Sequence, residues 1–117
     1  MSIAKGYIYA ELEITDQDYF YDEYMPRVHP VLQKYKAKFL IAGGNPEVIE
    51  GERTVKRVVF LEFDTIDKAK EFYWSKDYQD VIDYRFKSAR THLYIMEGTP
   101  PGQSAEKAAA AQRSHAD

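Results

Sequence analysis

Two histidines and one glutamate are the candidates for proton transfer in this 117-residue sequence. His29 precedes Pro30 in a segment of helical spacing, and an imidazole at an irregular part of a helix suits a general base or a haem ligand. His92 lies in the last alternating segment, and Glu62 lies in an apolar run, where burial would raise its carboxyl pKa. The structural alternatives are an exposed helix residue for His29, a subunit-interface residue for His92 and an ion pair for Glu62. The partners open to Glu62 are Arg85, Arg57 and Lys56.

Phenols and one guanidinium form a second group of candidates. Aromatic residues make up 15% of the chain, and ten of them are tyrosines. Tyr73, Tyr78 and Arg85 share a helical flank, and Tyr24 lies on an earlier helix. We expect these side chains to line a cleft between helices and sheet, where they suit an oxygenated aromatic compound or a small carboxylate. The alternative is a packed core whose tyrosine hydroxyls reach solvent.

The glycine pair Gly43–Gly44 also has two interpretations. Its backbone N–H groups can stabilise an oxyanion, which makes the pair a candidate substrate-binding element. The alternative is a bulge that bends a strand at this point. The candidate catalytic residues are then His29, Glu62, Tyr24 and His92, and the candidate substrate-binding residues are Tyr73, Tyr78, Arg85, Gly43 and Gly44.

Composition excludes several other kinds of chemistry. The sequence has no cysteine, so disulfides, iron–sulfur clusters and thiolate nucleophiles are ruled out. It has no histidine spacing typical of metal sites, no phosphate loop and no nucleotide fingerprint, so we expect neither a metal nor a cofactor. The net charge of −3 argues against nucleic acid or an anionic membrane as partner. No run is apolar enough for a signal peptide or a membrane span, so we expect a cytoplasmic location.

Hydrophobic spacing predicts the elements that position these residues. Alternation predicts strands over residues 6–14, 38–50 (interrupted at the glycine pair), 55–63 and 91–97. Helix starts are predicted within Thr15–Asp18, at Asp64 or Thr65, and at Ser75. Pro26 and Pro30 predict a bend over residues 25–30 of the first helix, because neither has an N–H to donate. We expect one domain over residues 1–98 and an Ala-rich tail over 99–117, weakly helical at 105–112.

The order β-α-β-β-α-β predicts a ferredoxin-like α+β fold, with a four-stranded antiparallel sheet and both helices on one face. The other face of the sheet would be apolar and aromatic. Its expected residues are Tyr7, Tyr9, Val58, Phe60, Tyr94 and Met96. Monomers seldom expose such a patch, so the pattern predicts a homodimer in which two sheets form a closed barrel around a two-fold axis.

Several short segments together resemble a known family over residues 5–98. They are Glu23-Tyr24, Val28-x-Pro30, Lys34-Tyr35, Phe39-Leu40, Gly43-Gly44, Arg57-Val58-Val59, Glu62-Phe63, Phe72-Tyr73-x-Ser75-x-x-Tyr78-Gln79, Arg85 and Glu97-Gly98. In order and spacing they are similar to proteins grouped as domain of unknown function 1330. The chain differs from that pattern at Lys36-Ala37, where a glycine pair is usual, and at Ala42, where an arginine is usual.

The resemblance implies membership of the dimeric α/β-barrel superfamily. Members of this superfamily include cofactor-free monooxygenases, muconolactone isomerases, polyketide cyclases, haem-degrading enzymes and stress-responsive proteins. The resemblance therefore implies architecture more than chemistry. We expect a small cofactor-independent enzyme of isomerase, cyclase, lyase or oxygenase type that acts on a small hydrophobic or aromatic carbonyl or carboxyl compound. The alternatives are a non-catalytic ligand-binding or stress-associated module, and a haem-handling protein with His29 as ligand.

Overall fold

The computed structural model describes residues 4–100 of the chain. Its centre is strand β1 (Gly6–Ile14), whose side chains alternate between buried and partly buried positions. Ile8, Ala10 and Leu12 face the helices, as their period of two requires, and Tyr7 and Tyr9 face the opposite side. The predicted strand over residues 6–14 is confirmed.

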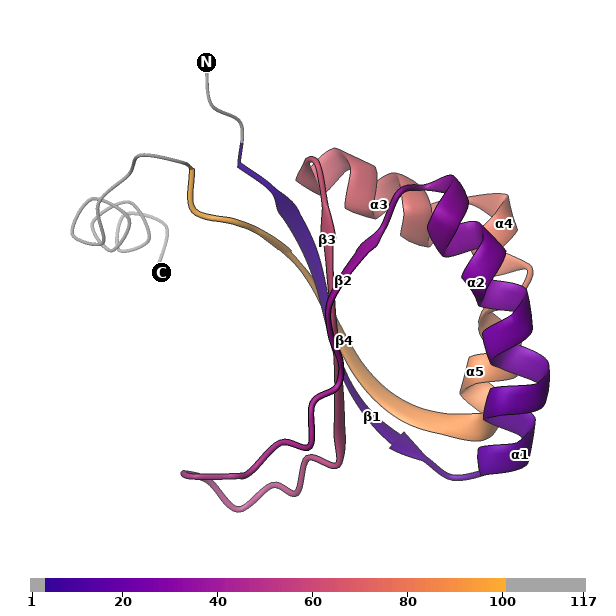
Figure 1. Ribbon diagram of the computed structural model, residues 1–117, viewed down its shortest axis with the longest axis vertical. Helices are drawn as coiled ribbons and strands as arrows, with labels where there is room; N and C mark the ends of the chain where they lie inside the picture. The colour runs from indigo at the N-terminus through magenta and orange to yellow at the C-terminus, as the bar shows by residue number, and fades with distance from the viewer. Residues whose placement is uncertain (1–3, 101–117) are drawn as a thin grey trace.

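A four-stranded antiparallel sheet is built around β1. Strand β3 (Arg57–Phe63) pairs with one edge of β1 and strand β4 (Ala89–Glu97) with the other, while β2 (Lys38–Gly43) pairs with the outer edge of β3. The strand order is therefore β2-β3-β1-β4. Among residues 4–100, all helices lie on one face of this sheet, and the other, helix-free face carries none (Figure 1).

The first helical segment is continuous from Gln17 to Lys34 but changes its winding. It comprises α1 (Gln17–Tyr19), a π-helix η1 (Phe20–Tyr24) and α2 (Met25–Lys34), and the carboxylate of Asp16 caps its start by accepting from Tyr19 N–H at 3.1 Å. The irregularity thus precedes the residues where a bend was expected, and Pro30 lies inside α2. Pro26 has no N–H for the Asp22 carbonyl, so the change from π to α winding at this point breaks no hydrogen bond.

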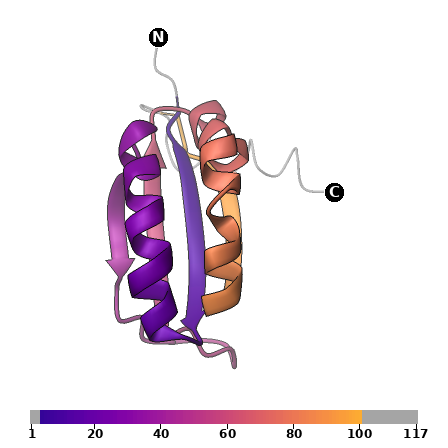
Figure 2. The ribbon, with the colours of Figure 1, turned by 90° about the vertical axis from the view of Figure 1, so that its right-hand side faces the viewer.

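The second helical segment consists of α3 (Ile66–Trp74), α4 (Lys76–Gln79) and α5 (Ile82–Ser88). Helix α5 leads directly into β4. The Thr65 hydroxyl caps α3 and the Ser75 hydroxyl caps α4, which confirms both expected helix starts. Figure 2 shows the two helical segments lying side by side over the sheet.

The segment after β2 differs from the prediction. Residues 47–50 form no strand, and β2 ends at Gly43, where the backbone turns to φ 93° and then to φ 71° at Gly44. These positive φ values lie in the region that favours glycine, so the pair ends the strand instead of bending it. The register shift in β2 lies earlier, between Phe39 and Ile41.

The core lies between the helices and the sheet. It is made mainly of Ile8, Leu12, Phe20, Val28, Leu61, Phe63, Ala69, Phe72 and Ile82. The register also confirms the composition of the helix-free face, because Tyr9 lies between Phe60 and Tyr94, and Tyr7 beside Met96. Within residues 4–100, no helix is long and apolar enough to cross a membrane. The expected helix over 105–112 lies outside the described residues.

Candidate functional site

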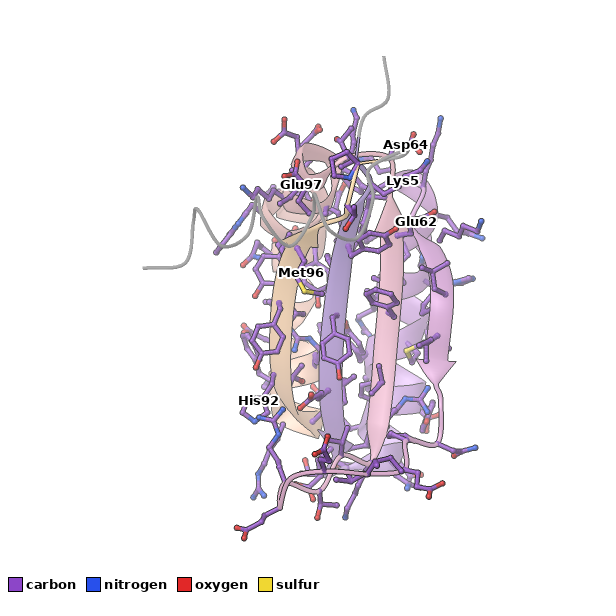
Figure 3. The ribbon with its side chains drawn as sticks, turned by 90° about the vertical axis from the view of Figure 1, so that its left-hand side faces the viewer. Lys5, Glu62, Asp64, His92, Met96 and Glu97 are labelled. Atoms are coloured by element: carbon purple, nitrogen blue, oxygen red, sulfur yellow. The ribbon has the colours of Figure 1, made fainter. Side chains whose placement is uncertain are left out.

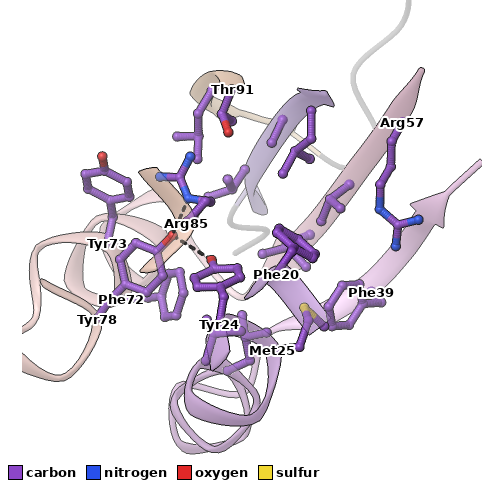
Figure 4. Close-up of a pocket in the computed structure, with 18 residues that line it drawn as sticks. Phe20, Tyr24, Met25, Phe39, Arg57, Phe72, Tyr73, Tyr78, Arg85 and Thr91 are labelled. Carbon is purple, nitrogen blue, oxygen red and sulfur yellow. Dashed lines mark hydrogen bonds between the residues drawn. The ribbon is translucent and has the colours of Figure 1, made fainter. Parts of the chain in front are cut away.

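A cavity of about 70 Å³ lies between the helices and the sheet (Figure 4). A water molecule in the liquid takes about 30 Å³, so that volume has room for about two water molecules. Its walls are mainly apolar, and their larger members are Leu12, Phe20, Val28, Phe39, Val59, Leu61, Phe72 and Leu93. Six lining residues carry polar atoms: Tyr24, Tyr73, Tyr78, Arg85, Arg57 and Thr91. The prediction that Tyr24, Tyr73, Tyr78 and Arg85 line a helix–sheet cleft is therefore confirmed.

A hydrogen-bonded chain of three side chains forms the polar part of this wall. The hydroxyls of Tyr24 and Tyr78 lie 3.0 Å apart, and Arg85 Nε donates to the Tyr78 hydroxyl at 3.1 Å. All three residues are buried, with Arg85 only 4% exposed. Among residues 4–100, no carboxylate forms an ion pair with Arg85. A buried cation without a counter-ion is costly, and an anionic ligand would supply the missing partner.

Local capping holds Tyr78 in this position. The Ser75 hydroxyl accepts from the Tyr78 N–H at 3.1 Å and donates to the Phe72 carbonyl at 2.7 Å, so one side chain joins the end of α3 to the start of α4. The Tyr78 ring then packs against Phe72 at a centroid distance of 4.7 Å. These contacts fix the phenol on a short helix that would be unstable alone.

Burial and the neighbouring phenol oxygens together set the protonation of the network. It raises the pKa of the Tyr24 phenol well above its usual value of 10, and the neighbouring Tyr78 oxygen raises it further. Burial lowers the pKa of Arg85, but the adjacent phenol oxygens of Tyr78 and Tyr24 more than offset this and leave it raised. At neutral pH the site therefore presents a neutral phenol that can donate a proton or hydrogen bond, beside a permanent positive charge.

Two further polar atoms of the cavity wall have no partner. Arg57 Nε and Thr91 Oγ1 are buried, and neither makes a hydrogen bond within the described part of the chain. Neither residue is among the candidate site residues predicted from the sequence, where Arg57 is a possible ion-pair partner of Glu62. The signal was present in the alternation, since Arg57 shares its face of β3 with Val59 and Leu61.

The three candidate acids and bases lie outside the cavity. His29 is exposed on α2, and Glu62 and His92 lie on the helix-free face of the sheet, as Figure 3 shows. Glu62 accepts from the Tyr7 hydroxyl at 3.1 Å; burial and this bond raise the pKa of Tyr7. None of Arg85, Arg57 and Lys56 forms an ion pair with Glu62 among residues 4–100. The tertiary structure thus separates this carboxylate and both imidazoles from the phenols that line the cavity.

The glycine pair is likewise not part of the cavity wall. A Cβ atom at Gly43 would lie 3.1 Å from Nη1 of Arg57, so the absence of a side chain there leaves space for the guanidinium. Within residues 4–100, no group of three histidine or acidic side chains is arranged to hold a metal ion.

Fold and cavity together define a small α+β protein with a mainly apolar cavity between its helices and its sheet. The chain belongs to the family described as domain of unknown function (DUF1330), whose model matches residues 5–99. This confirms the family resemblance found in the sequence. No curated protein matches the chain.

Two solved structures of the RPA0582 protein are similar in fold. One is described as a protein of unknown function from Rhodopseudomonas palustris and a structural genomics target; it is 14% identical, with a TM-score of 0.67 over 84% of this chain and 85% of that one. The other, methylated RPA0582, is 13% identical, with a TM-score of 0.68 over 86% and 85%. The likeness supports a mixed α+β fold with a four-stranded antiparallel sheet, consistent with a ferredoxin-like fold.

Proposed function

We propose that this chain binds a small, mainly apolar organic acid in the cavity between helices and sheet and acts on it without a cofactor. The observation that carries the proposal is the burial of Arg85 beside an apolar cavity without a carboxylate partner among residues 4–100. A guanidinium presents parallel N–H donors that match a carboxylate. The aromatic and aliphatic walls would enclose the rest of the ligand.

The chemistry that we propose uses the phenols as acids. Tyr24 stays protonated because burial raises its pKa, so it can donate a hydrogen bond or a proton to a carbonyl oxygen of the ligand. Arg85 and Tyr78 would fix the carboxylate and hold that oxygen against Tyr24. This arrangement suits enolisation or isomerisation of an oxo acid, in which a water molecule takes the proton from carbon and the Tyr24 hydroxyl stabilises the negative charge that develops on oxygen.

A non-catalytic ligand-binding role is the second candidate, and one observation favours it. None of the described residues that line the cavity is a histidine, aspartate or glutamate. Removal of a proton from carbon would then fall to a water molecule or a phenolate, both of which are weak or scarce at neutral pH.

Binding and chemistry can be tested in sequence. Titration calorimetry with valerate and 2-oxovalerate should show binding to the wild type that is lost in Arg85→Gln and kept in Arg90→Gln, which removes an exposed arginine from the other face of the sheet. Proton NMR in D₂O then follows exchange at carbon 3 of 2-oxovalerate. Exchange that is faster than in buffer, and that is slowed at least tenfold by Tyr24→Phe, supports the enzyme. Binding without accelerated exchange supports the second candidate.

We also infer that the working unit is a homodimer joined through the helix-free face of the sheet. This face carries a continuous aromatic group, in which Tyr7 stacks on Phe60 at 5.1 Å and Tyr9 lies 6.0 Å from Phe60 and 6.2 Å from Tyr94. Tyr94 and Met96 remain 47% and 40% exposed. The loop after β2 extends to the same side (Figure 1) and exposes 80% of Ile49. A second copy presents the same apolar face and would cover this one around a two-fold axis.

Analytical ultracentrifugation tests the dimer. The wild type should sediment at twice the chain mass of 13.6 kDa. Tyr94→Glu places a charge in the aromatic face and should give monomers. Tyr21→Glu is the matched control, because Tyr21 is 46% exposed but lies on the helical side, and it should stay dimeric. A wild-type monomer would refute the dimer without affecting the ligand site.

A further inference from the structure

One row of side chains crosses the floor of the cavity. In the sheet register Arg57 of β3 pairs with Leu12 of β1, and Leu12 pairs with Thr91 of β4. All three side chains line the cavity. Since neighbouring strands lie about 4.8 Å apart, the Cα atoms of Arg57 and Thr91 are about 10 Å apart, with an apolar leucine between them.

Both ends of this row carry buried polar atoms that lack a partner. Arg57 Nε and Thr91 Oγ1 make no hydrogen bond among residues 4–100, and no carboxylate in that range forms an ion pair with Arg57. Buried donors without a partner are rare and destabilising. Two of them in one cavity wall are positions where a ligand or a water molecule can form hydrogen bonds.

The two guanidiniums lie at different sides of the cavity. Arg85 belongs to α5 and lies near the Tyr24–Tyr78 pair, whereas Arg57 lies across the cavity beside Phe39 (Figure 4). Arg57 also packs over Gly43, where a Cβ atom would lie 3.1 Å from Nη1. The space between the guanidiniums is bounded by apolar side chains, among them Leu12 and Leu61.

We propose that the ligand of this cavity is a short dianion, such as a dicarboxylate, that spans from Arg85 to Arg57. This proposal rests on the proposed binding of an organic acid at Arg85 and adds a second anionic group. The first carboxylate binds at Arg85, the apolar middle lies over Leu12, and the second accepts from Arg57 Nε. Thr91 donates its free hydroxyl to the ligand at the β4 side of the row.

Titration calorimetry at 0.15 M salt can compare acids of equal carbon number that differ only in the second carboxylate. The pairs are glutarate with valerate, adipate with hexanoate, and pimelate with heptanoate. We expect the best dicarboxylate to bind the wild type at least about tenfold more tightly than its partner, as a charged hydrogen bond allows. Arg57→Gln should remove this preference, so that each dicarboxylate binds no more tightly than its monocarboxylate partner. Arg90→Gln is the matched control and should keep the preference.

The outcomes separate the two proposals. Equal affinity for both members of every pair, or a preference that persists in Arg57→Gln, would overturn the dianion and leave the organic acid at Arg85. Failure of all six acids to bind would overturn both proposals. If Arg57→Gln does not fold by circular dichroism, Thr91→Val provides the second test, and it should weaken dicarboxylate binding several-fold. An unchanged dicarboxylate Kd in that variant would also contradict the assignment.

Discussion

Arg85 Nε donates to the Tyr78 hydroxyl at 3.1 Å, and this bond ties the buried guanidinium to the phenol pair in the cavity wall. The pair joins α5 to α4 at the wall of the cavity. A structural arginine in a core is normally surrounded by carboxylates or carbonyls that satisfy its donors. An arginine that is hydrogen-bonded to a phenol instead retains N–H groups that can donate to a ligand.

Arg85→Met separates the structural role from the functional one. It replaces a buried charge by an apolar side chain of similar length. The free energy of unfolding should therefore rise, or fall by no more than about 1 kcal/mol. Binding of organic acids should be lost in the same variant. Urea denaturation, monitored by circular dichroism, measures the change in the free energy of unfolding. A loss of about 3 kcal/mol or more would mean that Arg85 mainly holds the fold together.

The buried phenol of Tyr24 predicts a loss of stability in alkali. Its pKa is raised well above 10 in the folded chain, while in the unfolded chain it titrates near its usual value. Above pH 10 the unfolded state therefore binds fewer protons than the folded state, and the free energy of unfolding falls as pH rises. Below that pH the contribution is fully present.

Between pH 8 and pH 11, the melting temperature of Tyr24→Phe should fall less than that of the wild type. Tyr21→Phe alters an exposed phenol and should keep the wild-type slope. Identical slopes in wild type and Tyr24→Phe would show that this phenol ionises as readily in the folded chain as in the unfolded one.

Thr91→Val should stabilise the protein in the absence of ligand. The hydroxyl is buried without a partner among residues 4–100, and valine has nearly the same shape without the polar atom. The free energy of unfolding should rise by about 1 kcal/mol. Thermal denaturation of the ligand-free variant is the measurement, and a lower melting temperature would show that the hydroxyl already has a partner.

The Ser75 cap should matter to both the fold and the site. Ser75→Ala removes the acceptor for the Tyr78 N–H and should cost about 1 kcal/mol. Thr65→Ala removes the comparable cap of α3, whose hydroxyl accepts from Lys68 N–H at 3.2 Å, at a similar cost. Only Ser75→Ala should also weaken binding of an organic acid, because Tyr78 follows that cap. Equal binding in the two variants would contradict this link between cap and site.

The elements could be predicted from the sequence because their signals are local. A period of two assigned Tyr7 and Tyr9 to one face of β1 and Ile8 and Leu12 to the other, and the hydroxyls of Thr65 and Ser75 marked helix starts. The segment over residues 47–50 misled the prediction, since its apolar residues lie in a loop. Two glycines with positive φ end β2 before it, and a glycine pair does not by itself show whether a strand ends or bends.

Local patterns predict most of the helices and strands, the two faces of β1 and the family. Which polar groups meet depends on the packing of the folded chain. It brings Tyr24 and Tyr78 together across 54 positions, joins Arg57 to Thr91 through Leu12, and leaves His29 exposed outside the cavity. Periodicity predicts these contacts no further, because it specifies only the direction of a side chain relative to its own backbone. Its neighbours depend on strand register and helix packing, which are set by contacts between distant parts of the chain.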